Sequence, residues 1–315
     1  LMGSGPLTVI ASSTHTWSGN NSGYNGTLTL QGGGALRLSS AAAVNAATAY
    51  IFNGGTMNPN TAGPFNLGSL GGASGFLNPG AGRDFAVGFL NTDTTFGGVI
   101  GGAGNLIKMG TGTLTLSGAN TFSGATIISN GVVQIDDGSG IGKLGTGSVA
   151  NHSRLVFNRA GTLTAANLIT GVGSLTNMGS GKVVLTAANA YTGPTTVAAG
   201  TLSIGTASAV TSDYTVNDAA TLGATVTSAG ATLTQGNVTF GSGCSYEFDL
   251  GTFGNPANTV VTNTGTVTLN GDVTVNLLGT NLATGTITLL RYAGRAGAGS
   301  FVLGSLPANV NLASF

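Results

Sequence analysis

The sequence predicts an all-β fold, a right-handed parallel β-helix (β-solenoid) running through residues 1–315 as a single continuous unit. Three observations predict it. Short runs alternate aliphatic with hydroxyl side chains, single glycines separate the runs, and one pattern occurs twice, in residues 102–135 and 171–204. Period-two alternation gives a strand one apolar face. Strands this short bury that face only when coils stack on one another, with about 20 to 25 residues in each coil.

The composition limits the classes of function. The 315 residues include 56 glycines but only nine Lys or Arg and nine Asp or Glu. Because the nine Lys and Arg residues are few and scattered, they form no phosphate-binding patch. Nucleic acid is therefore excluded as a partner. With 41% hydrophobic residues the chain is expected to fold rather than remain disordered.

Membrane contact is expected only through a missing anchor or barrel. No apolar run approaches the roughly 20 residues of a spanning helix. Alternating runs of mostly four to six residues and an aromatic content of 6% do not fit a membrane β-barrel. The opening segment lacks the basic and apolar parts of a signal peptide.

Along the chain, "TWSGNNSGYNGTLTL" (16–30) is a loose copy of the later pattern. Residues 40–100 match it poorly, and their alanine-rich start favours a helix by propensity alone, but a coil with small inward residues fits the neighbouring segments better. The two clear copies predict eight strands. These are "NLIKM", "TLTLS", "ATIIS" and "VVQI", then "SLTNM", "KVVLT", "TTVAA" and "TLSI".

Glycines between these strands are expected to supply positive φ angles at the corners. Further alternating segments follow in residues 236–315. A β-sandwich array also accommodates short strands, but tight strand–glycine–strand corners favour the solenoid.

The two copies resemble the autotransporter-associated β-strand repeat of autotransporter passenger regions. Residues 236–315 resemble the C-terminal end of such regions and are expected to form a C-terminal passenger-like region. That family's pattern has Gly, Leu, Lys, Leu, Asn, an aromatic residue and Gly in a fixed order. Lys108 occupies the lysine position of the first copy, whereas Asn177 replaces it in the second. The resemblance implies a bacterial surface or secreted β-helical passenger, and it supplies no catalytic residue. Family passengers often have Asp near the position of Asn258, to which we assign no role.

The residues themselves predict no catalytic, cofactor-binding or metal-binding site. Polysaccharide hydrolases and lyases on this fold need two or three converging carboxylates, or Asp-bound calcium with a basic Arg or Lys. Asp136 and Asp137 fit a solvated loop after a strand better than a calcium turn. Glu247 and Asp249 stand two apart in a strand, so they share the face opposite Tyr246, Phe248 and Leu250.

Several other residue types favour structural roles. His15 and His152 lie far apart in the sequence. Cys244 has no disulfide partner and is expected to be a packed or a corner thiol. Asn120 and Asn189 recur at matching places, where their amides are expected to satisfy corner backbone groups or to stack as a ladder.

The predicted function is that of a non-enzymatic structural or adhesive β-solenoid at a bacterial surface, acting as a rod, stalk or fibre-forming subunit. Low charge favours self-association, lateral or end to end. One alternative is a glycan-binding adhesin, with Trp17, Tyr24, Tyr50 and Tyr292 as candidate contacts for surface glycans or matrix proteins. A remote alternative is a polysaccharide-degrading β-helix enzyme.

Overall fold

A computed structural model describes residues 1–308 and 310 of the chain. The fold is all-β, with parallel strand pairs that form a β-solenoid, as predicted. The described residues contain one short 3₁₀ helix, η1 (Ala41–Ala43), where the alanine-rich segment begins. The chain divides into two compact units, Leu1–Val156 and Phe157–Phe315. Residues 309 and 311–315, at the end of the predicted 236–315 region, lie outside the described residues.

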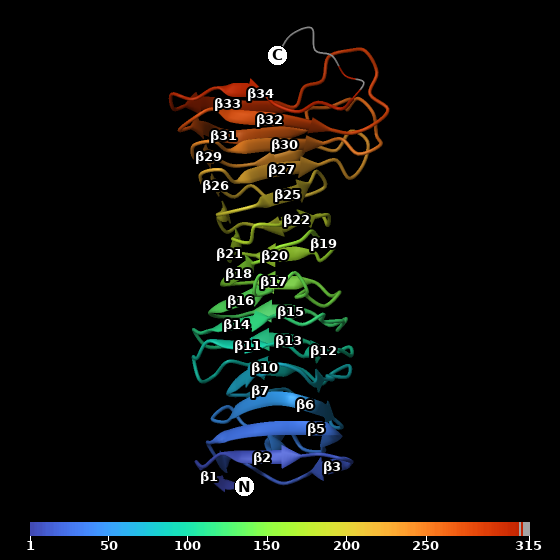
Figure 1. The fold of residues 1–315 in the computed structure, drawn as a ribbon, viewed down its shortest axis with the longest axis vertical. Helices are drawn as coiled ribbons and strands as arrows, with labels where there is room; N and C mark the ends of the chain where they lie inside the picture. Colours follow the sequence, from blue (N-terminus) through green and yellow to red (C-terminus); the bar gives the residue numbers. More distant parts are fainter. Residues whose placement is uncertain (309, 311–315) are drawn as a thin grey trace. The chain divides into compact units, whose positions relative to one another are not determined.

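The strands of unit 1 stack in three faces, coloured blue to green in Figure 1. The first face contains β2 (Leu7–Ile10), β3 (Thr14–Trp17), β5 (Thr27–Leu38), β6 (Ala49–Pro59), β8 (Ser69–Gly71), β9 (Phe76–Leu77) and β12 (Val99–Ile100). The second contains β7 (Phe65–Leu67), β10 (Phe85–Val87), β13 (Leu106–Lys108), β15 (Thr126–Ile128) and β17 (Val149–Asn151). The third contains β11 (Thr94–Phe96), β14 (Thr113–Leu116), β16 (Val132–Ile135) and β18 (Arg154–Phe157), which includes the unit boundary. A separate pair joins β1 (Met2–Gly3) to β4 (Gly23–Tyr24).

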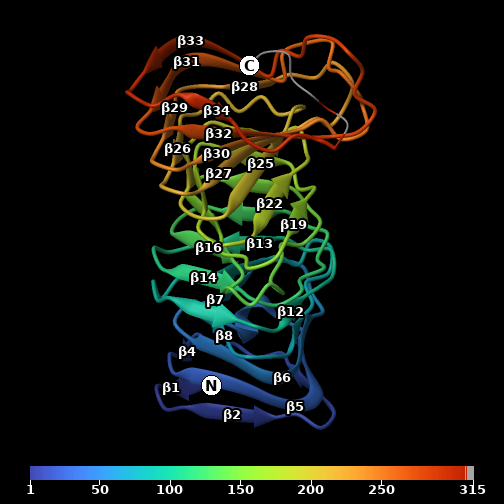
Figure 2. The same cartoon turned by 45° about the horizontal axis from the view of Figure 1, so that its top comes forward.

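Unit 2 has the same parallel stacking (Figure 2). One face contains β19 (Leu163–Ala165), β22 (Lys182–Leu185), β25 (Thr201–Gly205), β27 (Thr221–Thr225), β30 (Ser245–Asp249), β32 (Val273–Leu278) and β34 (Phe301–Leu303). Another contains β21 (Ser174–Asn177), β24 (Thr195–Val197), β26 (Tyr214–Val216), β28 (Leu233–Gln235), β29 (Val238–Phe240), β31 (Val261–Leu269) and β33 (Leu290–Ala296). A third pairs β20 (Ile169–Gly171) with β23 (Ala190–Tyr191).

All eight strands predicted in the two repeat copies are present. Within each copy, the first strand pairs with the third and the second with the fourth: β13 with β15 and β14 with β16, then β21 with β24 and β22 with β25. One copy therefore supplies two strands of one coil and the two strands of the next coil that stack on them. The stacking of coils buries the apolar face of each short strand.

Coil length grows along unit 2. Ile169 N donates to an amide oxygen 20 residues ahead, at Asn189. The corresponding separation is 24 residues between Asn237 and Asp213, and 29 between Ser305 and Asn276. The last coils are thus longer than the predicted 20 to 25 residues. The loops from 250 to 260 and from 279 to 289 lie between successive strands of these long coils, and they reappear at the candidate site.

Two strands are longer than the predicted short runs. β5 and β6 contain 12 and 11 residues. β5 pairs with β2 through its first half and with β3 through its second, and its pairing with β6 shifts register between Gly32 and Ala35. Gly32 has a φ of 85° at this point. The long strand is therefore two short strands continued through a glycine corner.

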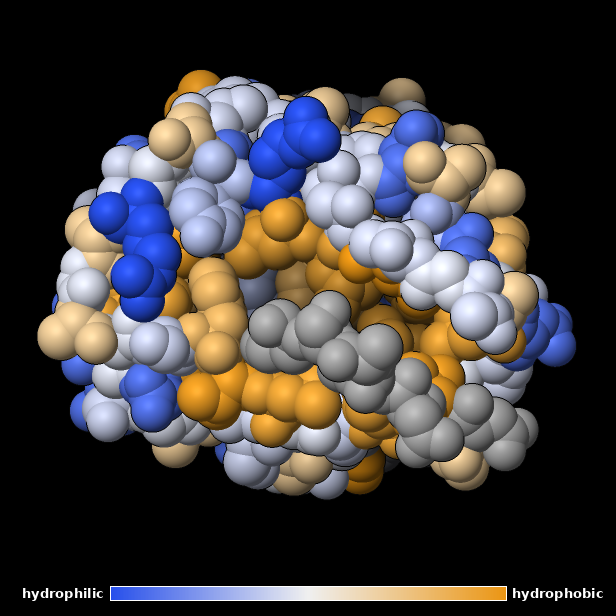
Figure 3. All heavy atoms as spheres, turned by 90° about the horizontal axis from the view of Figure 1, so that it is seen from above, coloured by the Kyte–Doolittle hydropathy of each residue, from blue (hydrophilic) through white to orange (hydrophobic). Residues whose placement is uncertain are grey.

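Apolar side chains fill the interior and polar side chains cover the outside. In β30 the burial alternates, with Tyr246 and Phe248 inside. Their rings lie 4.5 Å apart, and Tyr246 also contacts Phe240 at 5.4 Å. A row of threonines with exposed or half-exposed side chains crosses unit 2 in register: Thr196, Thr215, Thr239 and Thr268. Figure 3, seen from the C-terminal end of unit 2, shows apolar atoms in the middle and polar atoms around them.

The corner glycines serve two purposes, only one of which was predicted. Gly131 and Gly200 have φ angles of 67° and 58°, as expected for corners. Gly124 and Gly193 instead lie against the preceding coil, where an added Cβ would come within 2.2 Å of a backbone oxygen. Stacking distance, rather than φ, requires glycine there. Within the described residues, no helix has the length and apolar character needed to cross a membrane.

Candidate functional site

The repeated asparagines hold the corners of the coils together. Asn120 is 1% exposed; its Oδ1 accepts from Ile100 N at 2.8 Å, and its Nδ2 donates to Lys143 O at 2.8 Å. Asn189 accepts from Ile169 N at 2.8 Å in the same way. The predicted structural role of the two side chains is confirmed, since each satisfies backbone groups of neighbouring coils.

Lys108 and Asn177 explain how the second repeat departs from the family pattern. The buried Lys108 ammonium donates to Met109 O at 2.6 Å and to Gly110 O at 2.9 Å, and it reaches Asn130 O at 3.4 Å. Burial lowers the pKa of this amine. Asn177 Nδ2 donates to Ala199 O at 2.8 Å, the counterpart of Asn130 O. Either side chain therefore supplies a donor to the next coil.

Asp136 corrects the prediction of a solvated loop. Its side chain is fully buried, and its φ is 72°. The carboxylate accepts hydrogen bonds from Asp137 N at 2.7 Å, Ser139 Oγ at 2.8 Å and Gly140 N at 2.7 Å. Asp137 is exposed, as expected, and Ser139 holds the pKa of its carboxyl below the ordinary value. Asp136 is thus the centre of a tight turn.

Glu247 and Asp249 share the outer face of β30, as predicted. Sequence reasoning missed that Glu247 Oε1 lies 2.6 Å from Lys182 Nζ, 65 residues away. The pair crosses two intervening strands, where Ser203 and Gly223 leave room beneath it. A small side chain and a glycine are the signal that would have identified this path.

We expect this ion pair to contribute little to stability. Both side chains are partly exposed, 29% for Lys182 and 18% for Glu247, so solvent screens the attraction. A double-mutant cycle with Lys182→Met and Glu247→Gln should give a coupling free energy below about 1 kcal/mol in urea unfolding. A coupling well above that value would show that the pair clamps the coils together.

Cys244 is a buried, packed thiol, as predicted. Its Sγ lies 3.1 Å from Asn217 O in the coil below. Burial raises the pKa of the thiol, which disfavours the reactive thiolate.

The folded chain should therefore resist thiol reagents. With Ellman's reagent we expect very slow labelling in buffer and rapid labelling of the single cysteine in denaturant. Because the folded thiol keeps its proton where the unfolded thiol has lost it, raising the pH through the ordinary thiol range should favour the unfolded chain. Rapid labelling in buffer at a rate matching the unfolded chain would contradict the packed position.

The other predicted residues lie apart. His15 and His152 are both exposed. Among the described residues, no three His, Cys, Asp or Glu side chains gather as a metal site. Tyr24 and Tyr50 are buried. The Tyr24 hydroxyl donates a hydrogen bond to Gly5 O, and the Tyr50 hydroxyl accepts one from Asn45 N, so the prediction that they contact glycans is wrong.

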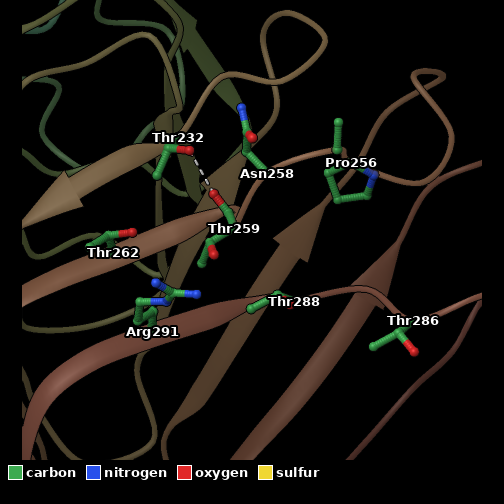
Figure 4. Close-up of a pocket in the computed structure, with 9 residues that line it drawn as sticks. Thr232, Pro256, Asn258, Thr259, Thr262, Thr286, Thr288 and Arg291 are labelled. Atoms are coloured by element: carbon green, nitrogen blue, oxygen red, sulfur yellow. Dashed lines mark hydrogen bonds between the residues drawn. The ribbon is translucent and has the colours of Figure 1, made fainter.

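The loops of the long coils enclose a polar groove of about 520 Å³ in unit 2 (Figure 4). It is lined by Thr232, Pro256, Ala257, Asn258, Thr259, Thr262, Thr286, Thr288 and Arg291. Thr262 of β31 and Arg291 of β33 are paired across neighbouring strands. Thr232 Oγ1 donates to Thr259 O at 2.7 Å, the dashed contact in Figure 4.

Sequence reasoning missed this groove. Nothing in the described part of the chain hydrogen-bonds or ion-pairs with the Arg291 side chain, so its donors are available beside a row of hydroxyls. Hydroxyl and guanidinium groups suit a hydrogen-bonding ligand. A signal was present in the segment "GTITLLR", in which a rare arginine follows two outward threonines.

The two repeats match a known family of repeats. The family model of the passenger-associated transport repeat matches residues 106–135 and 175–204. The adhesin BmaC autotransporter of Brucella suis biovar 1 (strain 1330) is 42% identical over 96 residues, which are 29% of this chain and 3% of that protein. The chain therefore spans a very small part of the relative's length. No solved structure matches the chain.

Proposed function

Because two segments of this chain are passenger-associated transport repeats of an autotransporter passenger region, we propose that it is a non-enzymatic adhesive module at a bacterial surface. The observation that carries the proposal is the repeat itself, whose buried Asn120 and Asn189 join neighbouring coils. The name of the relative, an adhesin, supports the adhesive part.

The stacked coils support a scaffolding role. Threonines at matching positions of successive strands give one face of unit 2 a row of neutral hydroxyl groups. Two of the carboxylates that stand close together in the sequence have partners within the protein, Asp136 in its turn and Glu247 with Lys182. The module acts by presenting a surface, without chemical conversion of what it contacts.

Adhesion of coated beads tests this function. Beads carrying residues 1–315 should attach to mammalian cell layers or matrix-coated glass at least tenfold more than beads carrying the heat-unfolded chain. Supernatants over polysaccharide substrates should gain no reducing ends. Attachment equal to that of unfolded-chain beads would refute the adhesive function, and released reducing ends would refute the non-enzymatic one.

The proposal includes self-association, in which the chain acts as a rod, stalk or fibre-forming subunit. The nine positive and nine negative residues give no net charge, so repulsion between copies is weak. Negative-stain electron microscopy over a concentration series should show lateral or end-to-end assemblies that increase with concentration. Separate particles at every concentration would contradict self-association and leave a stalk.

A second candidate is glycan binding in the groove beside Arg291. The observation that favours it is the row of hydroxyls along one wall with an available guanidinium. On a glycan array, the wild-type chain should give signals that Arg291→Gln reduces. A blank array for the wild-type chain would remove this candidate.

A further inference from the structure

Unit 1 contains a separate groove of about 330 Å³ on its first face. Strands β3, β5 and β6 form one side, and the segment from 78 to 83 forms the other. The lining residues are Thr14, Ala35, Arg37, Asn58, Pro59, Asn60, Asn78, Gly80 and Arg83. Two of the six arginines of the chain thus meet in one groove.

The two guanidinium groups are only partly used by the protein. Arg37 Nη2 donates to Asn60 Oδ1 at 3.0 Å, and Arg37 stands opposite Asn58 across β5 and β6. In the described part of the chain, nothing hydrogen-bonds or ion-pairs with the Arg83 side chain, and no Asp or Glu lines the groove. Several N–H donors and two positive charges therefore remain for a ligand.

Gly80 leaves room for the Arg83 guanidinium. A Cβ added at residue 80 would lie 2.6 Å from Arg83 Nη1. Its three nearest atoms would all belong to the Arg83 side chain. Arg83 N also donates to Gly80 O at 3.0 Å, which closes the turn. The guanidinium consequently lies directly over the glycine backbone, in a place that any other residue would fill.

Neutral hydrogen-bonding groups complete the groove. Asn58 Oδ1 is buried and has no hydrogen-bond partner among the described residues. Asn78 and Thr14 add an amide and a hydroxyl. The apolar lining consists of Ala35 and Pro59, which offer little surface for a lipid tail or a large peptide side chain. Amides and hydroxyls are the usual partners of sugar hydroxyls, since they both donate and accept.

We propose that this groove binds a saccharide bearing a carboxylate, such as a uronic acid unit of an acidic glycan. Arg37 and Arg83 receive the carboxylate, because guanidinium groups form paired, charge-assisted hydrogen bonds with it. Asn58 and Asn78 receive neighbouring ring hydroxyls. The inference rests on the proposed adhesive function and names the class of ligand for it.

Calorimetric titration of the whole chain with a hyaluronan hexasaccharide tests the site. The same hexasaccharide with its carboxyl groups reduced to alcohols is the neutral probe, and acetate and sulfate are the free-anion probes. The variants are Arg37→Gln, Arg83→Gln and Gly80→Ala, which moves Arg83 without removing its charge. Arg154→Gln is the matched control, because Arg154 is an exposed arginine of unit 1 that does not line the groove.

We expect the acidic hexasaccharide to bind and the reduced one to bind at least tenfold more weakly. Arg37→Gln, Arg83→Gln and Gly80→Ala should each weaken binding about tenfold, whereas Arg154→Gln should not. Binding should weaken as the salt concentration rises, since ions screen the attraction between the guanidinium groups and the carboxylate. Unchanged melting temperatures establish that each variant is folded, and the exposed position of Arg37 favours that result.

Three results would overturn the proposal: no binding of the acidic hexasaccharide, equal loss in Arg154→Gln, or acetate and sulfate binding as tightly as the sugar. Coated-bead adhesion separates this failure from that of the proposed function. If the beads attach but the hexasaccharide does not bind, only the inference about the groove fails. If the beads do not attach while the hexasaccharide binds, the adhesive function fails and the groove stands.

Discussion

Replacing Gly200 with alanine is expected to lower the free energy of unfolding by at least 3 kcal/mol, roughly the size of a severe core defect. Two effects combine. Gly200 has a φ of 58°, where a side chain costs about 1 to 2 kcal/mol. The new Cβ would also meet Gly179 O and Gly181 O, both at 2.4 Å, so the coils would have to separate. Urea unfolding followed by circular dichroism measures the loss.

Gly243 provides the matched control for Gly200. Its φ of 65° is nearly the same, but an added Cβ would have nothing within 4 Å. Gly243→Ala should therefore cost only the strain of the left-handed backbone, about 1 to 2 kcal/mol. Entropic effects on the unfolded chain are alike for both changes and cancel in the comparison. Equal losses of stability in the two variants would mean that close stacking of coils is not the reason why residue 200 must be glycine.

Replacing Asn120 with alanine is expected to cost about 2 to 4 kcal/mol. The change leaves Ile100 N without its acceptor and Lys143 O without its donor in a buried corner, and each stranded group costs about 1 to 3 kcal/mol. Because Asn120 connects the coils on both sides, we also expect faster hydrogen exchange at Ile100 N. Urea unfolding and exchange measured by mass spectrometry test the two effects.

Asn53 is the control for Asn120. It is an exposed asparagine in β6, and the same substitution there should change stability by less than about 0.5 kcal/mol. If Asn120→Ala were as mild as Asn53→Ala, the buried amide would not join the coils.

The sequence allowed the fold and the roles of the repeat residues to be predicted. Alternation in segments such as "TLTL" determines which side chains face inward, and that rule is local. The fixed spacing of Asn120 and Asn189 likewise indicated a repeated corner. The lysine-to-asparagine change at 177 was visible, but only the position of Ala199 O explained why it is tolerated.

Contacts between distant segments were beyond sequence reasoning. The ion pair of Lys182 with Glu247 depends on three successive registers, which no local pattern specifies. The grooves beside Arg291 and beside Arg37 form where long loops or turns of different coils meet. The burial of Asp136 was missed because an Asp-Asp-Gly segment usually indicates an exposed turn, whereas here the first carboxylate closes the turn from inside.

Attachment of living bacteria tests whether the folded chain is an adhesive module. Residues 1–315 would be displayed on a non-adherent strain, with surface level matched by antibody staining to a strain displaying Gly200→Ala. We expect at least tenfold more attached cells for the wild-type chain than for the parent strain, and a large loss of attachment for the variant. Attachment equal to that of the parent strain, at full surface display of the folded chain, would show that the chain is not adhesive.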